Sequence, residues 1–235
     1  QTLYYGSAVS ATVNQGQQQV NSGTTAIGTQ VIGGGVDHQQ FGTQVVANGG
    51  VARETTVQDY GNQVVSSGGS AVDTTLVSGG QQTINDHGLA SNTTVSSGGT
   101  VTVNPGGSLN GGTVLDGGTL RVMQDSSDVA ILSGVTVESG GVFALTGDVS
   151  QASIQALTLM KGAGIHFEML DYSTEAPIVT VSGSTVTVQG EASDGTAITQ
   201  AFTLTGIDGS ITADEFQLVS DGDGGTNLTY VACYC

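Results

Sequence analysis

The chain has 235 residues, of which 38 are glycine and only two are proline. Glycine is therefore more than twice as frequent as the ~7 % found in ordinary proteins. Charged residues make up 10 % of the chain, and 20 acidic groups face three basic ones, giving a formal net charge of −17. Three cations cannot follow a phosphate backbone, which excludes nucleic-acid binding and docking on an anionic membrane surface. No apolar run approaches the ~18 residues of a membrane-spanning helix, so we expect no membrane insertion by this segment.

An internal repeat governs the first half of the chain. Glycines recur at a 19-residue interval, at Gly23, Gly42, Gly61, Gly80, Gly99 and Gly118. Two aliphatic columns keep the same interval, namely Val57, Leu76, Val95 and Val114, and Val46, Val65, Ile84 and Val103. Each unit holds two extended runs closed by glycines, which is typical of strand, turn, strand, turn. Strong helix formers are scarce, so we predict an all-β protein.

One 19-residue unit is too short to bury an apolar face by itself, and stacking solves that problem. If each unit forms one coil, equivalent strands pair in parallel about 4.8 Å apart and the aliphatic columns merge into one core. We therefore predict a right-handed parallel β-helix, a β-solenoid of about 19-residue coils, with a β-rich capping subdomain at its C-terminal end. The interval itself comes directly from the sequence.

Side chains alternate between the two faces of a strand, so one aliphatic column fixes the direction of its neighbours. If Val57, Leu76 and Val95 point inward, the residues that precede them point to solvent. These residues form a threonine column, for which we predict a binding role: Thr56, Thr75, Thr94 and Thr113.

The repeat predicts two parts of the chain. Residues 1–141 form the glycine-rich β-helix, which is irregular before residue 41 and most regular over 42–118. The next glycine pair, Gly140 and Gly141, closes a longer unit, which predicts a loop over 124–128. Residues 142–235 contain fewer glycine pairs, 11 of the 20 acidic groups and alternating strand-like runs. We interpret them as an acidic cap that covers the open strand edges of the solenoid.

The phrase that runs from Gly68 to Gln82, Gly-Gly-Ser-Ala-Val-Asp-Thr-Thr-Leu-Val-Ser-Gly-Gly-Gln-Gln, resembles the repeats of AIDA-type autotransporter adhesins. The resemblance covers residues 41–118 well and 1–40 loosely. It implies a passenger that is secreted or displayed on the outer surface of a Gram-negative bacterium and acts in adherence, self-association and biofilm formation. In some members the repeat carries heptose, and the matching positions here are Thr55, Thr56, Thr74, Thr75, Thr93 and Thr94.

An enzyme on the same fold is the alternative, because β-helices also host proteins that bind or degrade polysaccharides. Glycoside hydrolysis needs two carboxyl groups about 5 to 9.5 Å apart. In the column of Asp59 the next acid is Asp116, three coils away. The three histidines share no repeat position, which favours surface histidines over a metal ligand or base. We therefore expect no catalytic residues and no enzymatic activity.

One segment near the C-terminus is similar to a calcium loop. Asp221, Asp223 and Asn227 are its candidate metal ligands, but a glycine stands at the fifth position and Ala232 replaces the bidentate glutamate. A hairpin turn is the simpler interpretation of this segment. Calcium is the one candidate cofactor that the sequence offers, and no other cofactor is expected. The cysteines, Cys233 and Cys235, are too few for a zinc site.

Two functions follow from the sequence. The first is an adhesin whose partners are a second copy of itself or a glycan or protein on a host or neighbouring cell. The second is a β-helical polysaccharide-binding or polysaccharide-degrading protein. Because acidic copies repel one another, self-association is expected to strengthen with salt or divalent cations.

Overall fold

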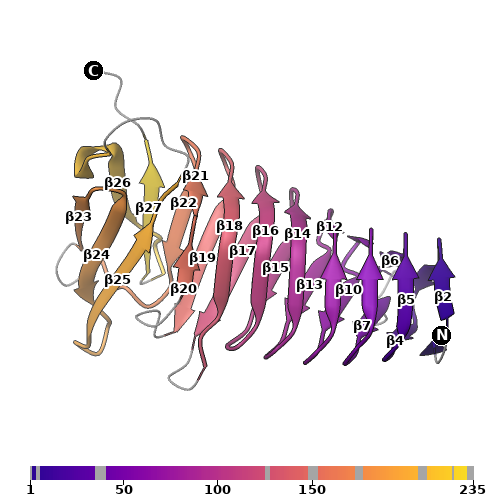
Figure 1. The fold of residues 1–235 in the computed structure, drawn as a ribbon. Helices are drawn as coiled ribbons and strands as arrows, with labels where there is room; N and C mark the ends of the chain where they lie inside the picture. The colour runs from indigo at the N-terminus through magenta and orange to yellow at the C-terminus, as the bar shows by residue number, and fades with distance from the viewer. Residues whose placement is uncertain are drawn as a thin grey trace.

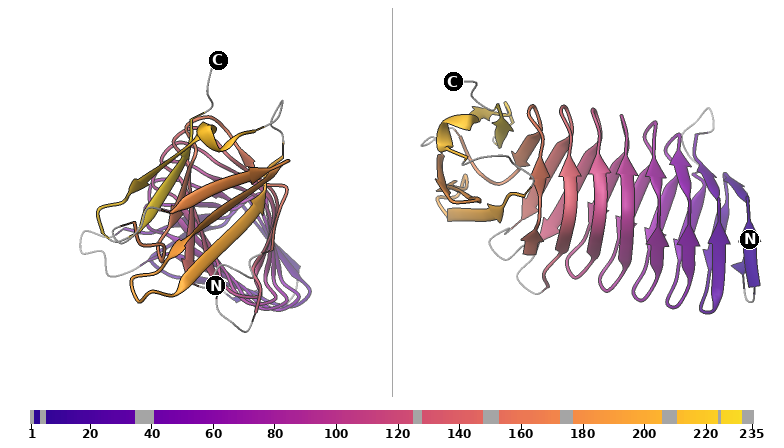
Figure 2. Two further views of the ribbon diagram at one scale, coloured as in Figure 1. Left: turned by 90° about the vertical axis from the view of Figure 1, so that its left-hand side faces the viewer. Right: turned by 45° about the horizontal axis from the view of Figure 1, so that its top comes forward.

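The structure is a computed structural model that describes residues 2–3, 6–34, 41–124, 128–147, 153–172, 177–205, 211–223 and 225–231. It confirms the all-β prediction and shows a parallel β-solenoid closed at its C-terminal end by a cap (Figure 1). The one helical element among the described residues is the short 3₁₀ helix η2, Ala213–Glu215. Figure 2 shows an elongated rod with the N-terminus at one end and the cap at the other.

Sheet A has 11 strands, one from each coil of the solenoid and the last two from the cap. Its strands are parallel except for the last two, β27 and β26, which are antiparallel to their neighbours. In order across the sheet they are β1 (Thr2–Leu3), β4 (Gln17–Val20), β7 (Thr43–Val46), β10 (Asn62–Val65), β13 (Gln81–Ile84), β15 (Thr100–Val103), β17 (Thr119–Gln124), β19 (Val142–Gly147), β22 (Gly164–Phe167), β27 (Thr226–Tyr230) and β26 (Phe216–Ser220).

Sheet B has 13 strands, because most coils contribute two short strands or one long bent strand to it. The first strands of the coils are β2 (Gly6–Val9), β5 (Thr24–Ile27), β8 (Val51–Arg53), β11 (Ser70–Val72) and β20 (Ser153–Gln155). The second strands are β3 (Thr12–Asn14), β6 (Gln30–Ile32), β9 (Thr56–Gln58), β12 (Thr75–Leu76) and β21 (Thr158–Leu159). The long strands are β14 (Leu89–Val95), β16 (Ser108–Val114) and β18 (Ile131–Val137).

The bend between the two halves of sheet B occurs at one left-handed residue per coil. Glu54, Asp73 and Asn92 have positive φ values of 52° to 56°. In the next two coils the same position is occupied by Gly111 and Gly134. The residues that follow Glu54, Asp73, Asn92 and Gly134 are buried in the solenoid, so the chain changes direction at the bend and the stacking register is kept.

The stacking register explains both the regular repeat and its exceptions. Thr56 pairs with Thr75 and Thr75 with Thr94, each pair one repeat apart. Gly23, however, does not stack on Gly42, as the 19-residue interval predicted. Its N–H donates to the carbonyl of Gly49 instead. The coil between them is lengthened by residues 33–41, of which 35–40 lie outside the described residues. Most of the expected loop at 124–128, and both cysteines, also lie outside them.

Two glycines close most turns for two different reasons. Gly68 has a φ of +71°, which L side chains rarely adopt. Gly69 has no such φ, but a Cβ there would lie 2.3 Å from the carbonyl oxygen of Val46 in the preceding coil. The first glycine therefore makes the turn and the second lets neighbouring coils approach. His87, which stands between Gly68 and Gly106 in this stack, adopts the same conformation with a φ of 55°.

The core of the first coils contains a polar ladder that the sequence analysis missed. Gln18, Gln44, Gln63 and Gln82 are buried on the inner face of sheet A. Each Nε2 from Gln44 onward donates to the Oε1 of the preceding glutamine, at 2.6 to 2.7 Å. Each Oε1 also accepts a hydrogen bond from a buried threonine of its own coil, from Thr29, Thr55, Thr74 or Thr93. We call these eight residues the glutamine ladder.

The glutamine ladder ends where both of its partners change together. After Gln82 the same position in sheet A holds Val101, Leu120 and Phe143. The position of Thr93 becomes Gly112 and then Val135. A buried amide or hydroxyl that lost its partner would cost about 1–3 kcal/mol. Paired replacement avoids that cost, and the remaining coils have an aliphatic and aromatic core.

The solenoid continues beyond residue 141. Strands β19 and β22 pair in parallel with the preceding coils of sheet A. Strand β27 then pairs antiparallel with β22 and covers the last edge. A separate antiparallel sheet, β23 (Ile178–Ser182), β24 (Thr185–Glu191) and β25 (Ala197–Thr203), lies beside it in the cap (Figure 1).

Replacing the second glycine of a turn tests the close approach of the coils. We expect Gly69→Ala to destabilise the chain by about 1–3 kcal/mol, because its Cβ would overlap the Val46 carbonyl. Gly164→Ala is the matched control, since a Cβ there would lie 3.8 Å from its nearest neighbour. Urea unfolding measures both; equal midpoints for the two variants would contradict the steric argument.

Replacing the last pair of the glutamine ladder tests its role in stability. Gln82→Val leaves the Thr93 hydroxyl without its acceptor, and we expect a loss of about 1–3 kcal/mol. Adding Thr93→Gly reproduces the pair found one coil later, so the double variant should lose less than the sum of the two single losses. The control is Thr94→Val on the outer face. Strict additivity of the two changes in urea unfolding would show that the residues are not coupled.

Candidate functional site

A continuous column of threonines runs along the outer face of the second half of sheet B. The parallel register aligns side chains from β9, β12, β14, β16, β18 and β21. We call this column the threonine ladder: Thr56, Thr75, Thr94, Thr113, Thr136 and Thr158. The first four are the residues that the sequence predicted to bind, and the structure places them in register and half-buried. The last two were missed because the longer coils break the 19-residue interval.

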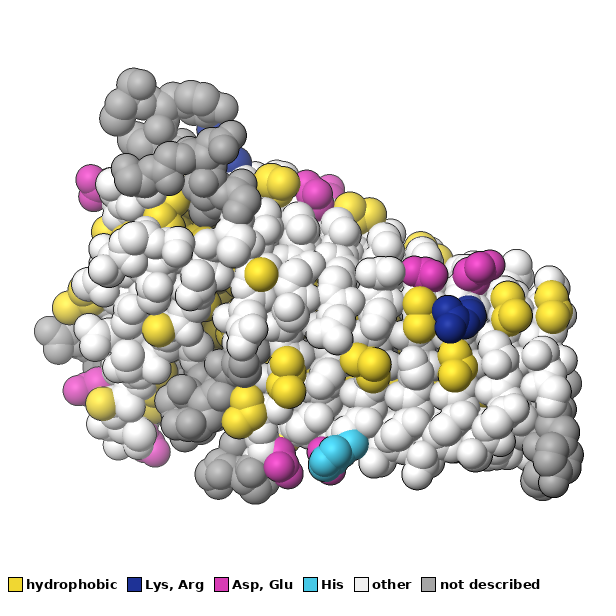
Figure 3. Space-filling view, viewed as in Figure 1, with side chains coloured by type: hydrophobic (Ala, Val, Ile, Leu, Met, Phe, Trp, Pro, Cys, Tyr) yellow, Lys and Arg dark blue, Asp and Glu magenta, His cyan; other side chains and the backbone are white. Residues whose placement is uncertain are grey.

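The hydroxyls of the threonine ladder are available to a partner. Within the described part of the chain, no hydrogen bond of the Thr56, Thr75 or Thr94 hydroxyl is found. Thr158 is different, because its hydroxyl lies 3.2 Å from that of Thr205 in the cap. Strand spacing puts neighbouring hydroxyls about 4.8 Å apart. In the face shown in Figure 3, hydrophobic and charged side chains are scattered over the solenoid and do not form one large patch.

The other half of each Thr-Thr pair points the opposite way. Thr55, Thr74 and Thr93 are at most 1 % exposed and donate to the glutamine ladder. The resemblance implied that these three could carry heptose, and the structure contradicts this, because a sugar cannot be attached inside the folded core. Each buried threonine follows a glutamine at a constant spacing in the sequence. This spacing is the signal that could have distinguished the inward threonines from the outward ones.

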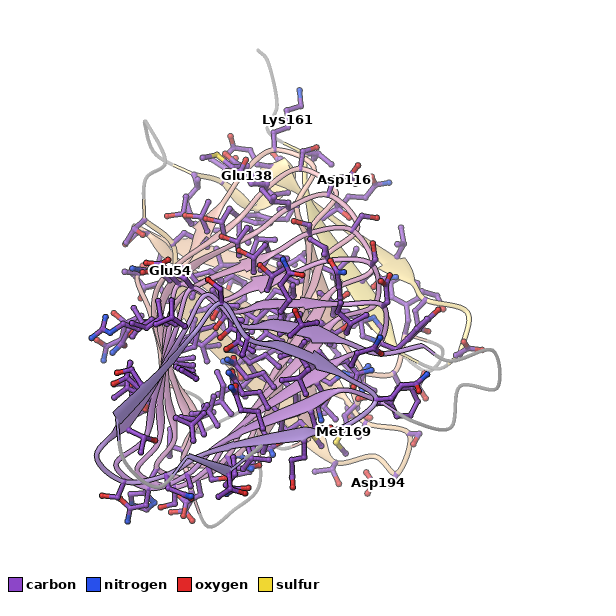
Figure 4. All side chains as sticks on the ribbon, turned by 90° about the vertical axis from the view of Figure 1, so that its right-hand side faces the viewer. Glu54, Asp116, Glu138, Lys161, Met169 and Asp194 are labelled. Atoms are coloured by element: carbon purple, nitrogen blue, oxygen red, sulfur yellow. The ribbon has the colours of Figure 1, made fainter. Side chains whose placement is uncertain are left out.

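Carboxylates of the described residues lie at several separate places on the surface of the solenoid. Figure 4 shows Glu54 on a different edge from Asp116 and Glu138. Glu54 and Asp73 do occupy equivalent positions in adjacent coils, a pair that the sequence analysis overlooked. Both lie exposed at the convex bend of sheet B, and the Oδ1 of Asp73 accepts a hydrogen bond from Asn92. This pair therefore lies on open surface, and not in a cleft where two carboxyl groups could face a substrate.

The candidate calcium ligands lie where the cap meets the last coil. Asp221 Oδ1 accepts the backbone N–H groups of Asp223 and Gly225, both at 2.8 Å. Its Oδ2 lies 3.7 Å from His166 Nε2, and His166 Nδ1 lies 2.8 Å from Asn227 Oδ1. His166 lies on β22 and is partly buried beside Asn227 of β27, unlike the surface histidine that was expected.

These contacts engage the oxygens of two of the candidate ligands within the protein itself. The oxygens of Asp221 and Asn227 that a metal would need already face hydrogen-bond donors or the imidazole. Within the described ranges, no group of three or more His, Cys, Asp or Glu side chains is placed to hold a metal ion. The contacts instead tie the loop after β26 to the solenoid, and calcium binding here stays an untested prediction.

The geometry defines a β-solenoid protein with a hydroxyl ladder on its outer face. No family model and no curated protein matches the chain. A solved structure of a TibA fragment hyperglycosylated by TibC is similar, with 30 % sequence identity and a TM-score of 0.49. The similarity covers 67 % of this chain and 61 % of that fragment, so less than two thirds of the fragment is matched. Among the described residues, no helix has the length and apolar character needed to span a membrane.

Asp221 gives the cap a dependence on acid. The backbone N–H of Asp223 is the main cause that lowers the pKa of Asp221 below its ordinary value of 3.8. Burial opposes it, and the N–H of Gly225 and the charge of His166 lower the pKa further. A lowered pKa stabilises the fold above 3.8, and this stabilisation is lost as the pH falls through the folded-state pKa. We expect Asp221→Asn to lower the unfolding midpoint at pH 7, with a difference that shrinks well below pH 3.8.

The control for this prediction is Asp223→Asn, which removes the same charge two residues away and keeps the backbone N–H groups in place. Chemical unfolding of both variants at the two pH values measures the effect. If Asp221→Asn lowers the unfolding midpoint by the same amount at pH 7 and well below pH 3.8, the stabilisation does not depend on the ionisation of Asp221.

Proposed function

We propose that this chain is the passenger portion of an adhesin, secreted or displayed on the outer surface of a Gram-negative bacterium, that acts by binding and not by catalysis. The observation that carries the proposal is the threonine ladder, in which six hydroxyls lie in register along one face. The resemblance of the Gly68–Gln82 phrase to AIDA-type repeats supports the same class.

Binding by such a face depends on the number of hydrogen bonds and not on the strength of any one of them. A single hydrogen bond adds only about 0.5–1.5 kcal/mol. A rigid column presents several at a fixed spacing, so a partner with the same spacing engages them together. A second copy of the chain has that spacing, which makes self-association the favoured mode. Glycans or proteins of a host or neighbouring cell are further partners in this proposal.

Charge sets the conditions under which copies associate. The net charge of −17 makes two copies repel each other, and salt screens that repulsion over a distance of about 10 Å at 0.1 M. Adherence and biofilm formation would then respond to ionic strength through the same surface. The acidic residues Glu54 and Asp73 lie at the bend beside the threonine ladder and contribute to this repulsion.

Bulky substitutions in the threonine ladder test the proposal. We expect the wild-type chain to self-associate more strongly as salt increases, and Thr75→Lys/Thr94→Lys to remain monomeric, because two lysines disrupt the in-register hydroxyls. The matched control is Thr83→Lys/Thr102→Lys, which adds the same charge to adjacent coils on the outer face of sheet A. Sedimentation velocity across salt concentrations measures all three proteins.

Aggregation of cells that display the same three proteins extends the test to adherence. A wild-type chain that is monomeric in every salt condition, or a control that fails as the ladder variant does, would contradict the role of this face. A glycan array with a turnover assay separates the alternative, since cleavage of a glycan would identify a polysaccharide-degrading β-helix. Retention without cleavage agrees with an adhesin.

A further inference from the structure

A second surface feature lies on the first half of sheet B, away from the threonine ladder. It is a hollow of about 450 Å³ where β14, β16 and β18 begin. Leu89 and Ile131 form its walls, and Ser108 lies between them in the strand register. Both apolar side chains are exposed, at 36 % and 44 %. We call this feature the acidic slot, for the carboxylates at its rim.

Small residues of one coil create the acidic slot. The coil that contains β16 contributes Gly106 and Ser108, while the coils on either side contribute larger side chains. Three adjacent coils span about 10 Å, so the missing side chains of the middle coil leave a gap roughly one aliphatic chain wide. Figure 3 shows hydrophobic side chains above this region and a histidine beside acidic side chains below it.

The rim of the acidic slot is negative. Asp86 lies on one side, with its Oδ1 2.5 Å from His87 Nδ1, and Asp128 lies on the other. The carboxylate of Asp86 extends over the backbone of Gly106, since a Cβ added there would overlap its oxygen. Among the described residues, no lysine or arginine lines the slot. Apolar walls and a carboxylate rim therefore meet within one small hollow.

We propose that the acidic slot binds a lysine or arginine side chain presented by a basic segment of a partner protein. A methylene stem packs against Leu89 and Ile131, and the cationic end reaches the carboxylates of Asp86 and Asp128. The net charge of −17 steers such a segment to the surface. This interaction is independent of the threonine ladder and of self-association.

Other occupants match the acidic slot less well. A second copy of this chain brings only three basic residues. Metal ions lack a group of three ligands in the part of the chain that the structure describes. A sugar ring commonly packs on an aromatic side chain, and the described residues that line this hollow include none. A cationic group on an aliphatic stem matches both the apolar walls and the carboxylates of the rim.

In the test, a short glycine peptide with one central lysine is titrated into the nitrogen-15-labelled chain. Binding is measured from changes in the amide chemical shifts of the chain. We expect the lysine peptide to shift the amides of Leu89, Ser108 and Ile131. The same peptide with norleucine, which keeps the stem and lacks the charge, should bind at least about ten-fold more weakly. Asp86→Asn/Asp128→Asn should weaken lysine-peptide binding by about ten-fold as well, or about 1.4 kcal/mol.

Two further variants separate a built site from diffuse attraction. Glu54→Gln/Asp73→Asn removes the same total charge elsewhere and should change the affinity by less than about two-fold. Ser108→Leu keeps every charge but fills the slot, and should abolish the shifts. Urea unfolding confirms that each variant is folded, and a variant that does not fold is replaced by the single change Asp86→Asn.

The proposal is overturned if Glu54→Gln/Asp73→Asn weakens binding as much as the slot variant, because the attraction would then be diffuse. Shifts confined to other amides, or shifts at Leu89 and Ile131 with neutral glycans and none with the lysine peptide, would also overturn it. Sedimentation of the slot variant should match the wild type, so a failure here is distinguishable from a failure of the threonine ladder.

Discussion

Hydrogen bonding between successive coils in a single register is the constraint on which the rest of the structure depends. Each strand pairs with its equivalent in the next coil, so every position in one coil has a fixed neighbour in the next. Columns of like residues follow directly: an aliphatic column becomes a core and a threonine column becomes a face. The turn glycines serve the same constraint, because a Cβ at Gly69 would hold two coils apart. Longer coils are tolerated where the additional residues leave the strands in register.

The same register explains why the core changes character along the rod. Near the N-terminus the aliphatic columns are accompanied by buried glutamine and threonine, which hydrogen-bond to each other within and between coils. Nearer the cap it is built from larger apolar residues such as Phe143 and Leu145. Hydrogen-bonded amides make the packing of the core directional and specific, while aliphatic and aromatic side chains supply its buried apolar area. The transition between Gln82 and Val101 requires the opposite wall to change in the same coil, from Thr93 to Gly112.

Much of this could be predicted from the sequence, because a repeat reports register directly. The parallel solenoid, the inward aliphatic columns and the outward direction of Thr56 and Thr75 all follow from a 19-residue interval and strand alternation. The glutamine ladder could not be found by the same reasoning, since glutamine and threonine are usually surface residues and burial depends on two columns facing each other across the core. The pairing of His166 with Asp221 was also beyond reach. It joins residues far apart in the sequence through antiparallel strands of the cap, where no repeat reports the register.

The glutamine ladder also gives the rod an electrical direction. Its linking hydrogen bonds run the same way, with the NH₂ group of each donor directed toward the preceding coil and the N-terminus. Aligned amides add their dipole moments instead of cancelling them. The acidic groups of the described residues in the cap add negative charge at the opposite end, so both contributions have the same sense. Two such dipoles side by side have their lowest electrostatic energy when they point in opposite directions. Rods of this kind therefore favour an antiparallel arrangement when they lie face to face, with the cap of each beside the first coils of the other.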